Sequence, residues 1–518
     1  MMNVRDLSLY YEDKAEPVLR DVSFSVNEKE TVLLLGASGS GKSTLTHCLT
    51  GLYPRELDGT MEGEVTFHHK PVAKAMPGAI SRSVGIVFQD PETQFCMLSV
   101  EDEVAFGLEN LEVEPDVMEE KIQKALKDVG LLEKRKEKIT SLSGGEKQKL
   151  ALACILAMDP PLIVLDEPTA NLDPLATENF VALLEPLKEE RGLSLFIIEH
   201  DLDPWVSITD RILMLGREGR IFYDGPLREG LETYADTLQQ DGIAMPRASR
   251  WALQSGVVVS PLPLTVEELK GRPPAPEPRE RGRREKEAPL IHAEDLSWKN
   301  VLQQVDVSIP EGSFTAVVGP NGSGKTTVCR LLAGIIKPSS GKVGDPFGKK
   351  ERFSRIGYVF QNPEHQFLTD SVWEEVAYGG ADKRQVKEML EWCGLSDHAK
   401  LHPFLLSQGQ KRRLSVATML VNDQDVLFLD EPTFGQDAES TEHLMELIAE
   451  KHRAGTTIVM ITHDMELIDT YATHVIAMKK GEVAFTGSPE ELWNEEVTSL
   501  HLKRPLRVQM KEAVYVPQ

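Results

Sequence analysis

Short uninterrupted runs of hydrophobic residues recur along the chain, and each ends in glycine or polar residues. TVLLL at residues 31–35 precedes a glycine-rich stretch, and PLIVLD at 161–166 and SLFIIE at 194–199 follow later. Continuous apolar runs of this length are typical of strands buried on both faces of a sheet. Alternating segments such as VLRDVSFSV at 18–26 indicate a small antiparallel sheet. The pattern predicts an α/β fold with a mostly parallel core sheet and an antiparallel β subdomain, with the site at the carboxyl ends of the parallel strands.

The chain repeats a set of short motifs in the same order. GASGSGKST at residues 36–44 returns as GPNGSGKTT at 319–327, LSGGE at 142–146 as LSQGQ at 406–410, and VLDEPT at 164–169 as FLDEPT at 428–433. A repeat of this length is a duplicated domain, and 518 residues suit two or more cores. We therefore expect one domain at residues 1–235, a linker at 236–289 and a second domain at 290–518.

The expected linker ends in GRPPAPEPRERGRREKEAP at residues 271–289, which is rich in proline, arginine and glutamate. It has no hydrophobic periodicity, so an extended, solvated segment is the favoured interpretation. Contact of its basic residues with lipid headgroups or RNA is a less favoured alternative. Residues 236–270 contain helix-like pieces and could form a cap on the first domain.

Composition narrows the class of protein. The net charge of −25 disfavours a general nucleic-acid binder, which needs a basic face to displace phosphate counterions. No apolar run approaches the roughly 18 residues that would span a bilayer, and the first residues do not resemble a signal peptide. The five cysteines are scattered without paired spacing, which favours reduced thiols in a cytosolic protein.

The two glycine-rich loops predict two phosphate sites. Each follows a buried strand and opens a helix, so that glycines let the backbone N–H groups turn toward phosphate oxygens and the helix N-terminus adds partial positive charge. A lysine reaches the β- and γ-phosphates, and the next hydroxyl is placed to hold Mg²⁺. The nucleotide-binding residues expected in the loops are Gly36, Ser38, Gly39, Gly41, Lys42, Ser43 and Thr44, and Gly319, Asn321, Gly322, Gly324, Lys325, Thr326 and Thr327.

Two acidic residues end a buried strand in each copy. Asp166 and Asp430 suit a Mg²⁺ position beside the phosphate loop. The following glutamates, Glu167 and Glu431, can polarise an attacking water as general bases. His200 and His463 follow further apolar strands, where each could hold the γ-phosphate and the water; these four residues are the expected catalytic groups.

The LSGGE and LSQGQ motifs resemble the signature of the ATP-binding cassette (ABC) family, and the resemblance covers nearly all of both halves. It implies two tandem P-loop NTPase domains, each with a helical signature subdomain, that pair head to tail as an internal pseudo-dimer. Each ATP would lie between the phosphate loop of one domain and the signature of the other. Ser407 and Gly409 would thus complete the site of Lys42, and Ser143 and Gly145 that of Lys325.

The same resemblance assigns Gln89 and Gln361 to the Q-loop, which links Mg²⁺ and water to a transmembrane partner. It places Asp173 and Asp437 in the D-loops and suggests that Tyr11 and Trp298 stack on adenine. The full set of expected Mg²⁺ ligands is Ser43, Gln89, Asp166, Thr326, Gln361 and Asp430.

Departures from the family pattern are mild. Gln408 replaces the first glycine of the second signature, and Gly435-Gln436 alters the second D-loop. Both glutamates and both histidines remain. We therefore expect both sites to hydrolyse ATP.

The Q-loop context narrows the resemblance further. VFQDPETQF at residues 87–95 and VFQNPEHQF at 359–367 are similar to the Q-loops of energy-coupling factor (ECF) ATPases, which power uptake of vitamins and metal ions. That implies a peripheral protein on the cytoplasmic face of the cell membrane, bound to a transmembrane coupling (T-type) subunit and a membrane substrate-binding (S-type) subunit. The favoured cargo is hydroxymethylpyrimidine (HMP) or thiamine, with cobalt or another vitamin as alternatives.

Three other interpretations of the repeated motifs remain open. A fused sugar-importer ATPase has similar length but is not expected to carry this Q-loop context in both halves. A ribosome-associated ABC protein is expected to have a long, charged helical linker, whereas this linker is broken by prolines. A DNA-repair ABC protein would carry zinc-binding cysteine pairs, which the sequence lacks.

Overall fold

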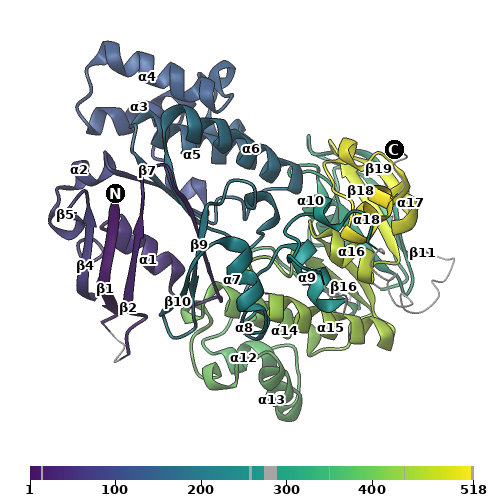
Figure 1. The fold of residues 1–518 in the computed structure, drawn as a ribbon. Helices are drawn as coiled ribbons and strands as arrows, with labels where there is room; N and C mark the ends of the chain where they lie inside the picture. Colours follow the sequence, from purple (N-terminus) through teal and green to yellow (C-terminus); the bar gives the residue numbers. More distant parts are fainter. Residues whose placement is uncertain (13–15, 256–258, 273–288, 349–350, 437, 515–518) are drawn as a thin grey trace. The chain divides into compact units, whose positions relative to one another are not determined.

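The computed structural model describes residues 1–12, 16–255, 259–272, 289–348, 351–436 and 438–514. The chain divides into two compact units, of which the first holds Met1–Leu172 and Ala176–Leu269 and the second Asp173–Leu175 and Lys270–Gln518. Each unit is an α/β domain with a mostly parallel sheet, as the hydrophobic pattern predicts (Figure 1). No helix in the described part of the chain combines the length and the apolar character needed to cross a membrane.

The first unit is built on a six-stranded sheet in the order β10-β9-β3-β8-β7-β6. Its strands are β3 (Thr31–Gly36), β6 (Val84–Val87), β7 (Leu162–Asp166), β8 (Ser194–Ile198), β9 (Arg211–Leu215) and β10 (Ile221–Gly225). Only β10 pairs in the antiparallel sense. Every residue of β3, β7 and β8 is buried, which explains their unbroken apolar sequences.

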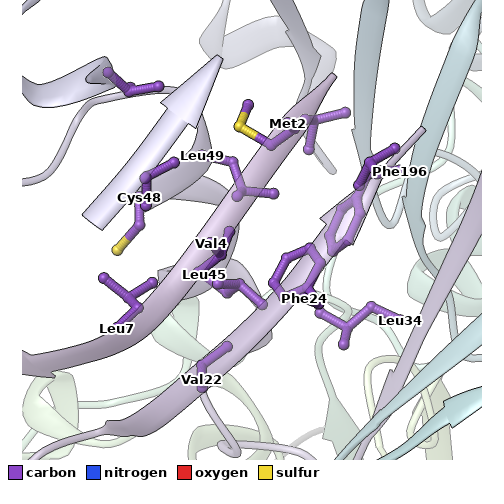
Figure 2. Close-up of a cluster of buried hydrophobic side chains, with 14 of the residues drawn as sticks. Met2, Val4, Leu7, Val22, Phe24, Leu34, Leu45, Cys48, Leu49 and Phe196 are labelled. Atoms are coloured by element: carbon purple, nitrogen blue, oxygen red, sulfur yellow. The ribbon is translucent and has the colours of Figure 1, made fainter. Parts of the chain in front are cut away.

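An antiparallel sheet of order β2-β1-β4-β5 packs beside this core. It contains β1 (Met2–Tyr10), β2 (Leu19–Val26), β4 (Thr60–Phe67) and β5 (Lys70–Pro71). Helix α1 (Lys42–Leu49) contributes Leu45, Cys48 and Leu49 to the same hydrophobic cluster, and Phe24 of β2 stacks on Phe196 of β8 with ring centroids 5.7 Å apart (Figure 2). Both sheets therefore hold the helix that follows the phosphate loop, which keeps its N-terminus in place.

Helices form the remaining layers of the first unit. The helical subdomain is made of α3 (Val100–Asn110), α4 (Pro115–Asp128) and α5 (Gly144–Ala157), and α2 (Pro77–Ser81) and α6 (Pro174–Arg191) complete the cassette. Ser143 caps α5 with a reciprocal capping box to Glu146. The signature motif is therefore the N-terminus of a helix, as the family resemblance implies.

Part of the stretch expected to be linker is folded. Helices α8 (Ala235–Gln240) and α9 (Arg247–Gln254) and a 3-10 turn at Glu267–Leu269 belong to the first unit, like the preceding α7 (Leu227–Thr233), which lies in the expected first domain. Leu238, Ala248 and Leu269 are at most 1% exposed, so this segment buries apolar surface that an extended linker would leave in water. The proline- and arginine-rich stretch 273–288 lies outside the described residues.

The second unit repeats the plan with small changes. Its core sheet has the order β15-β16-β17-β13-β18-β19, and a three-stranded antiparallel sheet has the order β12-β11-β14. The strands are β11 (Pro289–Trp298), β12 (Leu302–Pro310), β13 (Phe314–Val318), β14 (Ser340–Gly344), β15 (Ile356–Val359), β16 (Val426–Asp430), β17 (Thr457–Ile461), β18 (His474–Lys479) and β19 (Glu482–Gly487). The helices are α10 (Lys325–Leu332), α11 (Arg352–Arg355), α12 (Val372–Ala377), α13 (Lys383–Trp392), α14 (Gln408–Leu420), α15 (Ala438–Ala454), α16 (Met465–Tyr471), α17 (Pro489–Asn494) and α18 (Leu506–Val514).

A helix that begins just after a proline lies near the C-terminal end of each unit. An arginine of this closing helix binds an aspartate in the segment that follows β8 in the first unit and β17 in the second. Arg247 of α9 donates from its backbone N to Asp203 Oδ1 at 3.0 Å and from Nε to Oδ2 at 2.6 Å. In the second unit Arg507 of α18 binds Asp469 of α16 at 2.9 and 2.7 Å. These closing helices are a further part of the repeat, which their dissimilar sequences conceal.

Candidate ATP sites

Each phosphate loop is wrapped around its own lysine. Nζ of Lys42 donates to the carbonyls of Gly36 at 2.8 Å and Ala37 at 3.0 Å, and Nζ of Lys325 donates to Gly319 and Pro320 at 2.8 and 2.9 Å. Both ammonium groups are buried at the start of a helix. The two loops therefore hold a fixed positive charge where a phosphate chain would meet the helix N-terminus.

Glycine is required at the helix entry of both loops. Gly41 and Gly324 have φ of 100° and 101°, a conformation that other L-residues rarely adopt. A Cβ on Gly319 would lie 2.1 Å from the carbonyl oxygen of Met478, so this position also lacks room for a side chain. Local backbone geometry explains why the spacing of glycines is repeated in both loops.

A hydroxyl and a carboxylate meet beside each lysine. Ser43 Oγ donates to Asp166 Oδ1 at 3.3 Å, and Thr326 Oγ1 donates to Asp430 Oδ1 at 3.2 Å. Burial, together with the neighbouring charge of Glu167, raises the pKa of Asp166 to about 6. Burial and Glu431 likewise raise the pKa of Asp430. A buried carboxylate of this kind is stabilised by a cation, and oxygen ligands are those that Mg²⁺ prefers.

The other side of each aspartate is bound by different residues in the two units. Thr46 Oγ1 donates to Asp166 Oδ2 at 3.4 Å, whereas the hydroxyl of Tyr358 donates to Asp430 Oδ2 at 3.0 Å. Sequence reasoning missed both donors. Alignment of the two copies offers a signal, because Cys329 stands where the first copy has Thr46, and Ile86 stands where the second has Tyr358.

The structure brings the expected catalytic residues together within each unit. Nε2 of His200 lies 2.9 Å from Glu167 Oε1, and Nε2 of Gln89 donates to Glu167 Oε2 at 2.9 Å. In the second unit the distances to Glu431 are 3.1 Å from His463 and 3.3 Å from Gln361. Each glutamate thus has a histidine and a glutamine from other loops within 3.3 Å of its carboxylate.

Electrostatics keep both glutamates ionised. Burial acts to raise the pKa of Glu167, but the hydrogen bond and charge of His200 and the charge of Lys42 outweigh it and lower the pKa overall. The pKa of Glu431 is lowered in the same way, against burial, by His463 and Lys325. Both glutamates also have positive φ, 48° and 51°, which directs the chain away from the strand end. An ionised carboxylate with oxygen lone pairs is what a general base requires.

The Q-loop of each unit is attached to the signature helix of the same unit. Lys147 of α5 pairs with Glu92 of the 3-10 turn Pro91–Thr93, and Lys411 of α14 pairs with Glu364 of the turn Pro363–His365 at 2.6 Å. The signature serines Ser143 and Ser407 cap their helices, and Gly145 and Gly409 lie in the first turns. Among the described residues, no hydrogen bond joins either serine to the phosphate loop of its own unit.

The remaining expected residues have separate surroundings. The hydroxyls of Tyr11 and Thr44 lie 2.7 Å apart, so Tyr11 is connected to the phosphate loop. Trp298 has the ammonium of Lys299 4.3 Å from its ring centroid. Asp173 is buried, and Asp437 lies outside the described residues.

The comparison with known proteins decides the family. The model of the family described as "ABC transporter" matches residues 19–170 and 302–434, which are more than half of the chain. This chain belongs to the ABC transporter family. It is an ABC ATPase with two fused ABC domains, and such domains bind ATP.

Relatives of similar length are ABC proteins too. The "Putative HMP/thiamine import ATP-binding protein YkoD" of Bacillus subtilis (strain 168) is 44% identical over 512 residues, which cover 96% of this chain and 93% of the relative. A "Putative ABC transporter ATP-binding protein" of Methanosarcina acetivorans is 36% identical over 543 residues, covering 96% and 87%. The archaeal ribosome recycling factor aABCE1, solved with the ribosomal stalk protein aP1, superposes with a TM-score of 0.62 at 20% identity over 98% of both chains, which establishes similarity of fold alone.

Proposed function

We propose that this ABC ATPase is the energy-coupling subunit of an ECF-type importer, with HMP or thiamine as the favoured cargo. The observation that carries the proposal is the pair of near-identical Q-loops, FQDPETQF and FQNPEHQF, each in contact with a candidate general base. The printed name of the relative from Bacillus subtilis, an HMP/thiamine import ATP-binding protein, supports the same class of cargo.

The geometry of each unit supports the following proposed roles. Lys42 and Lys325 bind the phosphates of ATP, Glu167 and Glu431 accept a proton from water, and His200 and His463 orient that water and the γ-phosphate. We propose that Ser407 and Gly409 complete the first site and Ser143 and Gly145 the second, so that two bound ATP molecules draw the halves together. Helix N-termini capped by serine suit this role because their free N–H groups bind anions.

Mg²⁺ fits the oxygen-rich end of each site. Ser43, Asp166 and Gln89 would hold it in the first unit, and Thr326, Asp430 and Gln361 in the second. Bound there, the ion would neutralise phosphate charge. The chain's own contribution is to keep each aspartate buried and hydrogen bonded, so that its carboxylate points toward the phosphate loop.

The Q-loops are the proposed link to the membrane. Each Q-loop touches the general base through its glutamine and the signature helix through its glutamate–lysine pair, so movement at one end is passed to the other. Large apolar side chains are exposed just beyond: Leu98 is 82% exposed in the first unit and Leu368 69% in the second. We propose that these residues face a T-type subunit, which in turn engages an S-type subunit, on the cytoplasmic face of the membrane.

Purification of the tagged full-length chain from its own membranes tests this assignment. The expected result is co-purification of a multispanning membrane subunit, weakened by Leu98→Asp and Leu368→Asp while ATPase activity of the isolated chain is retained. Reconstituted vesicles should then take up labelled HMP or thiamine only with ATP. Co-sedimentation with ribosomes in place of a membrane partner would contradict the proposal and favour a ribosome-associated ABC protein.

A further inference from the structure

A buried glutamate joins the two loops that carry the first general base and its histidine. Glu199 follows β8 directly and is 5% exposed. Its Oε1 accepts hydrogen bonds from Thr169 N at 2.9 Å and Thr169 Oγ1 at 2.6 Å, and its Oε2 accepts one from His200 N at 3.3 Å. One carboxyl group therefore connects the turn that begins at Glu167 with the turn that begins at His200.

The second unit has no such connection at the matching position. Thr462 replaces Glu199, and its hydroxyl accepts from Asp464 N at 3.1 Å, a bond inside its own turn. Between the described residues of the two turns, no hydrogen bond joins Thr462 to Thr433, the counterpart of Thr169. The histidine and glutamine around Glu431 also lie farther from it, by 0.2 Å and 0.4 Å, than their counterparts around Glu167.

The buried carboxyl is costly to keep. Burial raises the pKa of Glu199 to about 8 despite the two hydrogen bonds from Thr169, and the nearby charges of Glu167 and Asp201 act in the same direction. Threonine fills the same position in the second unit without that cost. A buried ionisable residue with a shifted pKa that also ties two site loops together is typical of a functional site.

We propose that Glu199 is a positioning residue of the first ATP site, which holds His200 against Glu167 and makes the two sites unequal. This rests on the roles proposed above for Glu167 and His200. The tie acts through Thr169, so that the loops of the first site are ordered in advance. The second site has to order the corresponding loops when nucleotide binds, and its catalytic geometry forms at a larger entropic cost.

Two variants of the full-length chain distinguish the effect of the hydrogen bonds of Glu199 from the effect of filling space at this position. Glu199→Gln keeps an acceptor oxygen of the same shape, and Glu199→Thr installs the residue of the second unit. Hydrogen exchange without nucleotide is measured for peptides of residues 166–172, with 430–436 as internal reference. Glu199→Thr should speed exchange of the first peptide about tenfold, the factor expected for loss of one or two hydrogen bonds. Glu199→Gln should keep most of the protection, and the reference peptide should not change.

ATPase kinetics provide the second readout. Glu199→Thr should lower kcat of the chain at least twofold with little change in KM for ATP. Glu199→Gln should have a kcat close to that of the wild type. Unchanged exchange in Glu199→Thr, or equal loss in both variants, would overturn the positioning role. Failure of the proposed catalytic roles is distinguishable, because Glu167→Gln would then leave ATPase intact while Glu199→Thr still altered exchange.

Discussion

The two candidate ATP sites share their motif residues but differ in the side chains that hold them. Asp166 receives its second hydrogen bond from a threonine on the helix after the phosphate loop, and Asp430 receives it from a tyrosine on the edge strand β15. Thr46 is replaced by Cys329 and Ile86 by Tyr358, so the donor has moved from helix to strand while the carboxylate keeps its bond. The chemistry of a site thus strictly constrains the residues that take part in it directly. The hydrogen bond that supports the aspartate can come from any helix or strand close enough to reach its carboxylate.

Buried ionisable groups also differ between the units. The first has the acid Glu199 where the second has Thr462, and the second has Arg412 where the first has Gln148. Arg412 is 4% exposed, donates to the carbonyls of Phe360 and Gln361, and helps to lower the pKa of Glu431. The first site is therefore supported by an extra buried acid and the second by an extra buried cation, which suggests unequal responses to substitution and pH.

The sharpest test removes the proposed general bases. Glu167→Gln and Glu431→Gln together should lower ATPase turnover by about 10²- to 10⁴-fold, because a positioned base contributes that much to catalysis. Each single variant should also lower turnover, with the exposed Glu190→Gln as a control that does not. Steady-state phosphate release measures all four. An unaffected rate in either single variant would mean that its site is not working and that the units differ in kind.

The ion pairs of the two closing helices should contribute unequally to the free energy of unfolding. Arg507 and Asp469 are buried, with side chains 9% and 6% exposed, whereas Arg247 and Asp203 are 22% and 15% exposed. Arg507→Ala should lower the free energy of unfolding by about 3–5 kcal/mol, since it leaves a buried carboxylate without its cation. Arg247→Ala should cost less, because water screens its pair. Urea unfolding compares them with exposed Arg272→Ala, and equal losses would contradict the contrast in burial.

Substitution can test whether the hydroxyl donor that supports the aspartate of one unit can replace that of the other. Tyr358→Phe should destabilise the second unit by about 1–3 kcal/mol, because it leaves Asp430 with a buried oxygen that has lost its donor. Adding Cys329→Thr supplies the donor of the first unit and should recover part of that loss. The two variants are compared by denaturant midpoint at equal m-value. If Cys329→Thr alone and in combination changed stability equally, the two positions would not be coupled.

The last prediction concerns pH. The folded pKa of Glu199, about 8, is raised above its usual 4.5, so its protonated form favours folding at low pH and this contribution is lost as pH rises toward and through 8. Wild-type Tm should therefore fall more between pH 5 and pH 9 than that of Glu199→Gln, which cannot ionise. Scanning calorimetry at matched ionic strength measures the difference. Parallel Tm profiles would show that folding does not shift the pKa of Glu199.

Much of the cassette plan was predictable from local chemistry. The apolar runs predicted the buried strands, and the glycine spacing predicted both loops, because only a few residue types satisfy those backbone conformations and burial patterns. The segment 236–269 was harder to place, since its short helices are stabilised by contacts with Asp203 and with the rest of the first unit instead of by their own periodicity. Thr46, Tyr358 and Glu199 were missed for a related reason, because each acts on a residue that is distant in sequence.

The sequence by itself determined the family, the duplication and the identities of the residues expected to handle ATP. These depend on short-range rules: glycines that permit a loop, a lysine beside a helix start, and acids at the end of a buried strand. Only the tertiary structure decided how each acid is supported and where buried charge lies, because hydrogen bonds and desolvation depend on which distant strands and helices pack together. The motifs are nearly the same in the two sites, and the side chains packed around them differ.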